Sequence, residues 1–480
     1  MALTKVSYSM ITGATVNVLD YGAFNDNTNT AATTAAIQAA IDTGKNVFLP
    51  DGTYSINDAL TVFSDGQIIF GESFGNTSIV QTTVGENGIE VNNKQRVQIR
   101  NLKLSATGSN TKAGLYVTGS AYSTFSFLEI TGFNYGVHVN EGSLTYYSEL
   151  FIINTRSHGM YITGPTAACV DTTVMRSYIG GSGQAGTAHG VYIEGQASGI
   201  YFTKVDIYLS SGYGIFMETG VGLQPPNAGF FNQCIIDQNT AGGVRIDDGL
   251  LFEFNNCWTS GLSDGYWFDT AMSDARIIGG EVFNMGSHGV KIKGTRCSVV
   301  GTNIRGSGTS VVNTFDGIRI EGATAALVSG VNFDGDYNSV DTTRYGVSIQ
   351  SGGANNCYIT GCTFTNMASG DFIDEGGSTA NNRFLNQYQG GSVSIGNTAT
   401  ATLYTFPSQL QGNYLFFAGQ AANANGGIRA MAYVRVGSAS LAVSSIVAAG
   451  GATLSGTGFD VQVTNTAGGA VTFDYSWIKL

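Results

Sequence analysis

Prolines and charged residues are scarce in this chain. It has 5 prolines in 480 residues, and Asp, Glu, Lys and Arg together make up only 12%. Helices of soluble proteins favour Ala, Leu, Glu and Lys, so the shortage of charge argues against a helical fold. The chain instead has 67 glycines and 42% hydrophobic residues. This composition is typical of short strands joined by tight glycine turns, and we expect an all-β protein.

Positive charge is also in short supply. The chain has 22 Lys and Arg against 34 Asp and Glu, which gives a formal net charge of -12. Nucleic acids and anionic lipids are bound by clustered basic residues, so we expect no nucleic-acid partner and no membrane insertion. No apolar run has membrane-spanning length, and the N-terminus lacks the apolar core of a signal peptide. The sequence therefore predicts synthesis in the cytoplasm without a signal peptide.

Motifs that hold cofactors or metals are missing as well. The six cysteines form no CxxC pair and most of them lie in strand-like runs, so we expect buried free thiols. The sequence contains no Walker loop, HExxH, GxSxG or dinucleotide-binding fingerprint. We therefore expect no cofactor and no metal site.

What the sequence does contain is one short sequence motif that is repeated with variations, and we call it the phrase. "HGVYIEG" (189–195) returns as "YGIFME" at 213, "GGVRID" at 242 and "DGYWFD" at 264, always aligned on one glycine. These anchor glycines are 22 to 31 residues apart, a period that is typical of a solenoid. The anchors are Gly88, Gly114, Gly136, Gly159, Gly190, Gly214, Gly243, Gly265, Gly289, Gly317 and Gly346.

Apolar and variable residues alternate within each phrase. Ile215 and Met217 should therefore face inward, while Phe216 and Glu218 face outward. Because no repeat has room for a crossover helix, we predict a right-handed parallel β-helix with three short strands per turn, or rung. The predicted inward ladder consists of Ile89, Leu115, Val137, Met160, Val191, Ile215, Val244, Tyr266, Val290, Ile318 and Val347.

The two ends of the chain differ from the repeats. Residues 1–60 are predicted to form an N-terminal neck and cap, since residues 31–44 form an amphipathic helical pattern with Ile37 and Ile41 on one face. The β-helix itself is expected over 61–389. In 390–480, alternating runs separated by Gly, Asn and Ser predict a small antiparallel β-sandwich for trimerisation or carbohydrate binding; a plain C-terminal cap is the alternative.

One outward position of the rungs is acidic on four consecutive rungs in the middle of the chain. Strands of neighbouring rungs lie roughly 4.8 Å apart, so this position stacks four like charges, which costs electrostatic free energy. Residues that act as general acids and bases are often found in such unfavourable surroundings. The predicted catalytic residues are these four, Glu194, Glu218, Asp247 and Asp269. The whole carboxylate column comprises Asn92, Thr118, Asn140, Thr163, Glu194, Glu218, Asp247, Asp269, Lys293, Glu321 and Gln350.

The outward position two residues earlier is aromatic and then basic. Aromatic rings suit the apolar faces of sugars, and Arg and Lys suit acidic sugars. The alternative is a structural ladder whose basic residues pair with the carboxylates. The predicted substrate-binding residues of this aromatic-basic column are Tyr161, Tyr192, Phe216, Arg245, Trp267, Lys291 and Arg319.

Long loops near these columns favour a binding face. The segments 180–190 and 218–230 lengthen two repeats beside the four carboxylates. Two further loops lower down bring rival candidates, Asp316, Asp334, Asp336 and Asp341. His158, His189 and His288 each precede an anchor glycine, where Tyr and Asp stand in other rungs, so we interpret them as rung-corner residues rather than metal ligands.

Residues 16–56 contain "DYGA" (20–23), the helical pattern and "PDGTY" (50–54). This stretch resembles the start of pectate-lyase-like β-helix proteins, in which a DxGA turn, a capping helix and a P-x-G-x-Y strand open the solenoid. The segment "SYSMITGATVNVLDYGA" (7–23) is similar to bacteriophage tailspikes, and the final "YSWIKL" is similar to tail-fibre ends.

The resemblance implies a homotrimeric virion spike that joins the phage tail or an adaptor protein and acts at the host cell surface. Its expected substrate is a bacterial capsular polysaccharide or O-antigen. The catalytic residues do not carry over by motif: "RIDDG" at 245 and "SHGVKIK" at 287 are only fragments of the polygalacturonase pattern.

Three functions fit these residues. The first is glycoside hydrolysis by two of the four carboxylates, one as general acid and the other as base or nucleophile. The second is a polysaccharide lyase, in which Arg245, Lys291 or Arg319 neutralises a uronate. The third is a non-catalytic adhesin that only holds the glycan.

Overall fold

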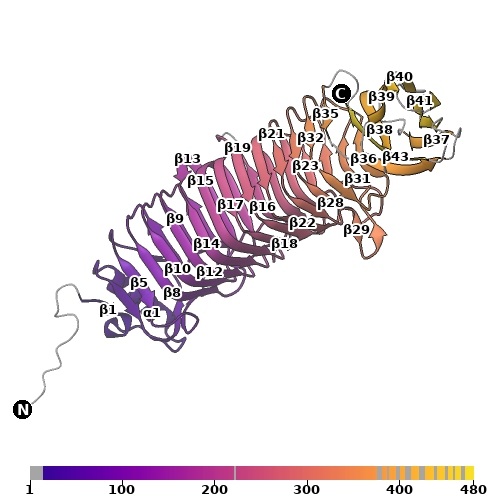
Figure 1. The fold of residues 1–480 in the computed structure, drawn as a ribbon. Helices are drawn as coiled ribbons and strands as arrows, with labels where there is room; N and C mark the ends of the chain where they lie inside the picture. The colour runs from indigo at the N-terminus through magenta and orange to yellow at the C-terminus, as the bar shows by residue number, and fades with distance from the viewer. Residues whose placement is uncertain are drawn as a thin grey trace, which may run out of the picture.

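A computed structural model shows a long parallel β-solenoid, with antiparallel strands at its C-terminal end (Figure 1). The solenoid has about 13 turns, and its successive strands pair in parallel along three columns. The sequence-based prediction of an all-β parallel β-helix is therefore confirmed. The structure describes residues 14–220, 223–375, 381–385, 389–395, 400–405, 412–420, 428–436, 441–448, 452–457, 460–465 and 471–479.

The first column of strands contains the repeated phrases, and we call it the anchor sheet. Its strands are β4 (Leu60–Thr61), β7 (Ile89–Asn92), β9 (Ala113–Thr118), β11 (Tyr135–Asn140), β13 (Met160–Val170), β15 (Val191–Tyr208), β16 (Tyr213–Glu218), β19 (Gly242–Asn255), β21 (Asp264–Ile278), β23 (Val290–Ile292), β26 (Ile318–Ile320), β31 (Tyr345–Ile349) and β34 (Gly370–Asp374).

The second column runs beside it and includes the later parts of β15, β19 and β21, which bend from one column into the next. Its other strands are β1 (Val16–Asn17), β2 (Val47–Leu49), β5 (Ile68–Gly71), β8 (Gln98–Ala106), β10 (Thr124–Thr131), β12 (Tyr146–Ile153), β14 (Thr173–Gly180), β17 (Asn227–Asn232), β24 (Ser298–Val300), β27 (Leu327–Ser329), β32 (Tyr358–Thr360) and β35 (Arg383–Leu385).

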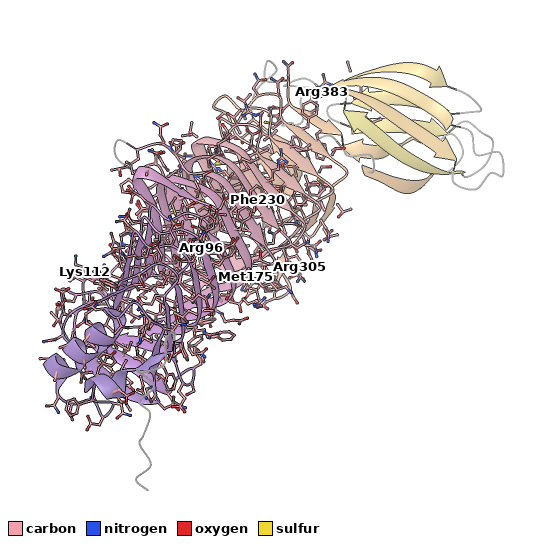
Figure 2. The ribbon with its side chains drawn as sticks, turned by 90° about the vertical axis from the view of Figure 1, so that its left-hand side faces the viewer. Arg96, Lys112, Met175, Phe230, Arg305 and Arg383 are labelled. Carbon is pink, nitrogen blue, oxygen red and sulfur yellow. The ribbon has the colours of Figure 1, made fainter. Side chains whose placement is uncertain are left out.

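The third column completes each rung, and the ends of β8, β10, β12, β14 and β15 extend into it. Its own strands are β3 (Gly52–Ile56), β6 (Thr77–Gln81), β18 (Ile235–Asn239), β20 (Trp258–Gly261), β22 (Glu281–Met285), β25 (Asn303–Arg305), β28 (Asn332–Asp334) and β33 (Thr363–Thr365). Side chains project from the outer surface along the whole solenoid (Figure 2).

The predicted inward ladder forms the core of the solenoid. All eleven of its members are no more than 1% exposed, and burial of one such aliphatic side chain stabilises the fold by about 1.5–3 kcal/mol. Tyr266 is the one polar member, and its hydroxyl accepts a hydrogen bond from Thr259 at 2.9 Å. The ladder therefore contains no unbonded tyrosine hydroxyl.

The anchor glycine repeats because the rungs leave no room for a side chain there. A Cβ placed on Gly190 would lie 2.4 Å from Ile207 Cγ2 and 2.8 Å from the carbonyl oxygen of Gly214, the next anchor. A Cβ on Gly243 would lie 2.5 Å from the carbonyl oxygen of Gly265 in the same way. Close stacking of the backbones, rather than an unusual φ angle, thus explains the repeated glycine.

The N-terminal end of the solenoid carries the short helix η2 (Val18–Tyr21) and the one α-helix of the described residues, α1 (Thr30–Ile41). Ile37 and Ile41 are fully buried, as the sequence pattern predicts. The helix ends three residues before Gly44, whose N–H bonds to the carbonyl of Ile41 at 3.0 Å. In the described part of the chain no helix is long and apolar enough to cross a membrane.

After β35 the described strands pair in antiparallel fashion. β36 (Gln389–Ile395), β38 (Gly412–Gln420), β39 (Ile428–Val436), β40 (Leu441–Ala448) and β43 (Val471–Lys479) form a five-stranded sheet. β37 (Thr400–Thr405), β41 (Ala452–Thr457) and β42 (Asp460–Asn465) form a three-stranded sheet. A separate hairpin, β29 (Asp336–Tyr337) with β30 (Val340–Asp341), protrudes from the solenoid (Figure 1).

The cysteines lie where the sequence predicts. All six are buried, and Cys169, Cys234, Cys257, Cys297 and Cys357 are free thiols. Burial raises the pKa of the Cys297 thiol to about 12, so this thiol is held in its unreactive protonated form.

Candidate functional site

Both predicted columns are in register on the outer face of the anchor sheet. Tyr161 pairs with Tyr192, Tyr192 with Phe216, and Phe216 with Arg245. Arg245 then pairs with Trp267, Trp267 with Lys291, and Lys291 with Arg319. The structure thus brings all seven predicted substrate-binding residues together in one line.

The four predicted catalytic carboxylates follow the same register. Glu194, on β15, pairs directly with Glu218 at the end of β16. Ile246 pairs with Met217 on one side and with Phe268 on the other, so Asp247 and Asp269 continue the column on the next two rungs. The four carboxylates therefore lie on consecutive rungs, whose strands are roughly 4.8 Å apart.

Glu194 and Glu218 have the same surroundings. Each accepts a hydrogen bond from a tyrosine hydroxyl on the preceding rung, Glu194 from Tyr161 and Glu218 from Tyr192. Burial raises the pKa of both tyrosines, and the bond to the carboxylate raises it further, so both phenols stay protonated as donors. Within the described residues, no basic side chain forms an ion pair with either glutamate. Both glutamates are thus oriented but not neutralised.

The loop after β16 closes against Glu194. A Cβ on Gly220, whose φ is +71°, would lie 2.5 Å from Glu194 Oε1. The hydroxyl of Thr219, the preceding residue, donates a hydrogen bond to Asp248. Glycine at 220 therefore allows the backbone to pack on the carboxylate, and a larger residue would displace it.

The aromatic part of the second column forms a stacked ladder. The rings of Tyr161 and Tyr192 lie 5.1 Å apart at 10°, and those of Tyr192 and Phe216 lie 5.7 Å apart at 10°. Because these rings cover one another's faces, they present edges and hydroxyls to the outside. The stacking fixes the two tyrosines that hold the glutamates.

Asp247 and Asp269 have basic partners instead. Arg245 Nε lies 2.5 Å from Asp247 Oδ1, and Arg245 Nη2 lies 3.1 Å from Asp247 Oδ2. The same guanidinium lies 3.9 Å from Asp269 Oδ2. Asp247 and Asp269 therefore fit the structural alternative, in which the basic residues of the aromatic-basic column form ion pairs with the carboxylates.

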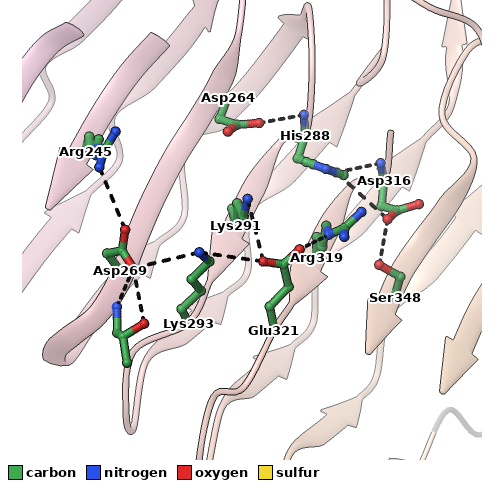
Figure 3. A network of polar contacts seen from close by, with 11 residues as sticks. Arg245, Asp264, Asp269, His288, Lys291, Lys293, Asp316, Arg319, Glu321 and Ser348 are labelled. Atoms are coloured by element: carbon green, nitrogen blue, oxygen red, sulfur yellow. Dashed lines mark hydrogen bonds and ion pairs between the residues drawn. The ribbon is translucent and has the colours of Figure 1, made fainter. Parts of the chain in front are cut away.

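Trp267 lies among cations. Arg245 and Lys291, on the rungs before and after it, lie 4.3 Å and 4.4 Å from its ring centroid. Lys293 lies 5.4 Å from the same centroid. A network of polar contacts links these cations to Asp269 and Glu321 (Figure 3). This end of the face is therefore rich in paired charge, whereas the Glu194 end is not.

The three predicted rung-corner histidines bond to the backbone of the next rung. Nδ1 of His158 accepts the N–H of His189 at 3.0 Å, and Nδ1 of His189 accepts the N–H of Tyr213 at 3.0 Å. His288 Nδ1 accepts the N–H of Asp316 at 2.9 Å. These lone pairs are thus used in the fold, and among the residues that the structure describes no group of three or more His, Cys, Asp and Glu could hold a metal ion.

Acidification is expected to destabilise the solenoid through its four histidines. Burial lowers the pKa of His138, His158 and His288 to about 4 and that of His189 to about 3. An unfolded histidine titrates near 6.5, so below that pH the unfolded chain binds more protons than the folded one. The free energy of unfolding should hold above about pH 6.5 and fall by about 2–3 kcal/mol per histidine toward pH 4. Urea unfolding across this range measures the loss.

A matched variant comes from the chain itself. Asn87 occupies the rung-corner position of an earlier rung, where its Oδ1 accepts the N–H of Ala113 at 2.8 Å. His158→Asn should keep this type of bond and reduce the pH dependence of unfolding. An unfolding free energy that does not change between about pH 7 and about pH 4.5 would contradict the prediction.

Of the four rival aspartates, Asp316 and Asp334 are bonded to neighbouring side chains of the fold. Asp316 is 0% exposed, and its two oxygens accept from Arg344 at 2.8 Å each and from Ser348 at 2.6 Å (Figure 3). Asp334 accepts from Asn366 at 3.0 Å. Asp336 and Asp341 face each other in the β29–β30 hairpin. None of the four lies in the two columns.

Sequence reasoning missed the specific cross-rung partners. Tyr161 and Tyr192 were predicted to bind sugar, and their hydrogen bonds to Glu194 and Glu218 join the two columns diagonally. Lys293 was assigned no role, although it lies beside Trp267. The sequence did contain one signal for these bonds. The two columns are two residues apart along each strand, so each tyrosine lies near the glutamate of the next rung.

Comparison with known proteins gives the fold class. The family model for the LAM55 pectate lyase-like domain matches residues 27–134. Among solved structures, the Dettilon tailspike protein gp208 is 12% identical with a TM-score of 0.54, over 97% of this chain and 94% of that one. The tailspike gp61 of Pseudomonas phage phi297 is also 12% identical, with a TM-score of 0.54 over 97% and 99%. The chain thus has a pectate-lyase-like β-helix fold that phage tailspikes share.

An enzyme structure shares this fold too. The A-module of the Azotobacter vinelandii mannuronan C-5 epimerase AlgE6 is 17% identical with a TM-score of 0.54, over 74% of this chain and 95% of that one. No curated protein sequence matches the chain.

Proposed function

We propose that this chain is a phage tailspike that binds and depolymerises a bacterial surface polysaccharide, capsule or O-antigen, by glycoside hydrolysis at Glu194 and Glu218. One observation carries the assignment: two carboxylates on adjacent, paired rungs are each held by a tyrosine hydroxyl, and no basic side chain among the described residues forms an ion pair with either. Of the four predicted catalytic carboxylates, these two can exchange a proton without breaking an ion pair.

The spacing of this pair favours a retaining mechanism. Adjacent rungs place the carboxylates roughly 4.8 Å apart, close to the roughly 5 Å of retaining glycosidases. One glutamate, in its protonated form, donates to the glycosidic oxygen while the other attacks the anomeric carbon. Water then releases the sugar as the first glutamate takes its proton back. Tyr161 and Tyr192 keep both carboxylates in position throughout.

The fold comparisons support the tailspike part of the proposal. Two tailspike structures share the architecture over nearly the whole chain. A spike of this kind acts at the host surface as part of the phage tail, as a homotrimer bound to the tail or an adaptor protein. The mannuronan epimerase with the same fold supports a glycan chain as the substrate.

The test is incubation with capsular polysaccharides and lipopolysaccharides from a panel of bacterial strains. Reducing ends and the ultraviolet absorbance of unsaturated uronates are followed together. Hydrolysis predicts new reducing ends without absorbance. Binding without either signal would leave a receptor-binding adhesin and refute the hydrolase.

A lyase is the second candidate, and Arg245 favours it. Its Nη1 lies 3.4 Å from the Tyr213 hydroxyl, and its guanidinium lies 5.8 Å from the Phe216 ring centroid. A guanidinium can neutralise a uronate carboxylate while Tyr213, ionised to the phenolate, takes the proton from the carbon next to that carboxylate. The bond to the glycosidic oxygen then breaks as the double bond forms, and that oxygen receives the proton from the phenol. Reducing ends with matching absorbance would support this mechanism.

A further inference from the structure

Two lysines converge on the indole of Trp267 from different columns. Lys291 belongs to the aromatic-basic column and Lys293 to the carboxylate column, and both follow Trp267 by one rung. Their Nζ atoms lie 4.4 Å and 5.4 Å from the centroid of the same ring. Their side chains are only 17% and 27% exposed. Two ammonium groups are therefore held together in a place that is mostly withdrawn from water.

Neither ammonium is satisfied by its acidic neighbours. Lys291 Nζ lies 3.6 Å from Glu321 Oε2, and Lys293 Nζ lies 3.9 Å from the same oxygen. Lys293 Nζ is also 3.9 Å from Asp269 Oδ1. These contacts exceed hydrogen-bond length, and neither lysine donates a hydrogen bond to any group in the described part of the chain. In contrast, Lys103 Nζ approaches Glu129 Oε1 to 2.7 Å.

The acidic neighbours are engaged elsewhere. Glu321 accepts a hydrogen bond from Arg319 Nε. Burial alone would raise the pKa of Glu321, but the bond from Arg319 and the nearby positive charges outweigh it and lower the pKa. Asp269 Oδ1 accepts from the Thr270 N–H at 2.7 Å and from its hydroxyl at 3.2 Å. The Asp269 oxygen nearest Lys293 therefore already has donors, and the bond from Arg319 holds Glu321 by Oε1, so that Oε2 stays 3.6 Å and 3.9 Å from the two lysines.

Trp267 adds an unsatisfied donor. Its indole N–H is shut off from solvent and has no acceptor among the residues that the structure describes. A buried N–H without a partner costs about 1–3 kcal/mol, and each ammonium has three N–H groups to donate. The buried indole N–H is out of reach of a ligand, so the donors that the cluster offers to oxygen acceptors are those of its two ammonium groups.

We propose that Lys291, Lys293 and Trp267 form a subsite for the carboxylate of an acidic sugar, so the substrate is an anionic polysaccharide. The two oxygens of a carboxylate match two ammonium groups, and the ring of Trp267 lies below both. This inference rests on the proposed function for the presence of a glycan on this face. It adds the substrate class and a residue, Lys293, to the binding face.

The subsite also fixes where the acidic sugar lies along the chain. Lys293 is three rungs from Glu218, roughly 14 Å at about 4.8 Å per rung. The acidic sugar is therefore some distance from the cleaved bond, on the C-terminal side of the face. The part of the glycan over Tyr161 and Tyr192 faces no ion pair and can be neutral.

The test pairs a protein change with a substrate change. A glycan that the wild-type protein cleaves is compared with the same glycan after its carboxyl groups are reduced to alcohols. We expect reduction to lower kcat/KM about 10- to 100-fold, as for the loss of a charge-assisted hydrogen bond. Lys291→Gln/Lys293→Gln should show the same low value with both glycans. Lys103→Gln, which breaks a lysine–glutamate pair on another column, is the control and should behave as wild type.

Each outcome decides the proposal. A lysine double variant whose kcat/KM is equally low on native and reduced glycan, and equal to that of the wild type on reduced glycan, supports it, provided that its unfolding midpoint matches that of Lys103→Gln. Equal cleavage of native and reduced glycan by the wild type overturns the subsite while leaving the hydrolase intact. Full activity of the double variant toward the native glycan overturns it as well.

A binding measurement separates the subsite from the hydrolase. Ligand-detected NMR with sodium glucuronate, glucose and sodium sulfate at equal ionic strength requires no cleavage. Binding of glucuronate but not glucose, lost in the double variant, supports the subsite even if no glycan is hydrolysed. Binding of sulfate in place of glucuronate would overturn the carboxylate assignment, and binding of neither would overturn the subsite.

Discussion

Glu194→Gln and Glu218→Gln should each lower kcat for polysaccharide cleavage about 10²- to 10⁴-fold, the usual contribution of general acid–base catalysis. The amide can neither donate the proton nor attack as an anion, but its oxygen can still accept the hydroxyl of Tyr161 or Tyr192. Glycan binding and thermal stability should therefore stay near wild-type values. Reducing-end assays, titration with uncleaved glycan and unfolding midpoints measure the three quantities.

The control for these variants lies on a neighbouring part of the solenoid. Glu253→Gln makes the same chemical change on β19, at a position that pairs with Phe230 and Arg276 in the second column of strands. Its activity should equal that of the wild type. Normal cleavage by both glutamine variants at 194 and 218 would place the reaction elsewhere and remove the basis of the hydrolase.

The sequence predicts the placement of both columns because strand geometry is local. Side chains alternate with a period of two, and parallel rungs repeat the same register, so one aligned glycine fixes the neighbours on every rung. Tyr192 and Phe216, and likewise Glu194 and Glu218, therefore pair as the alignment predicts. Fold class, core ladder and columns all follow from this one alignment.

The partners of each carboxylate could not be predicted in the same way. Asp247 pairs with Arg245 on its own strand, whereas Glu218 bonds to Tyr192 on the previous one. The choice depends on side-chain length and rotamer: a long guanidinium reaches along its own strand, and a stacked phenol points to the next rung. No spacing in the sequence records that choice. The four candidate carboxylates are equivalent in the sequence. Only the structure separates the two that pair with basic residues from the two that bond to tyrosines.

Asp316 shows the opposite case, a loop aspartate that looked like a rival catalytic residue. Asp316→Asn should lower the free energy of unfolding by about 1–3 kcal/mol, because it removes the buried counter-charge of the half-buried Arg344 guanidinium and disturbs the bond from Ser348. Both oxygens of Asp316 are bonded, to Arg344 and Ser348, and the residue is fully buried. His288 lies 3.9 Å away, but burial lowers its pKa to about 4, so it is neutral and cannot replace the lost charge.

Because a solenoid rung contacts mainly its neighbours, this loss should be local. Hydrogen exchange of the amides in β23, β26 and β31 should accelerate in Asp316→Asn, while that of β9 and β11 stays unchanged. Arg344→Gln added to this variant should recover part of the stability, since it removes the unpaired charge. Cleavage per folded molecule should equal wild type, because a carboxylate with no exposed surface cannot reach a glycan. A folded Asp316→Asn protein that binds glycan but does not cleave it would assign Asp316 to the catalytic site instead.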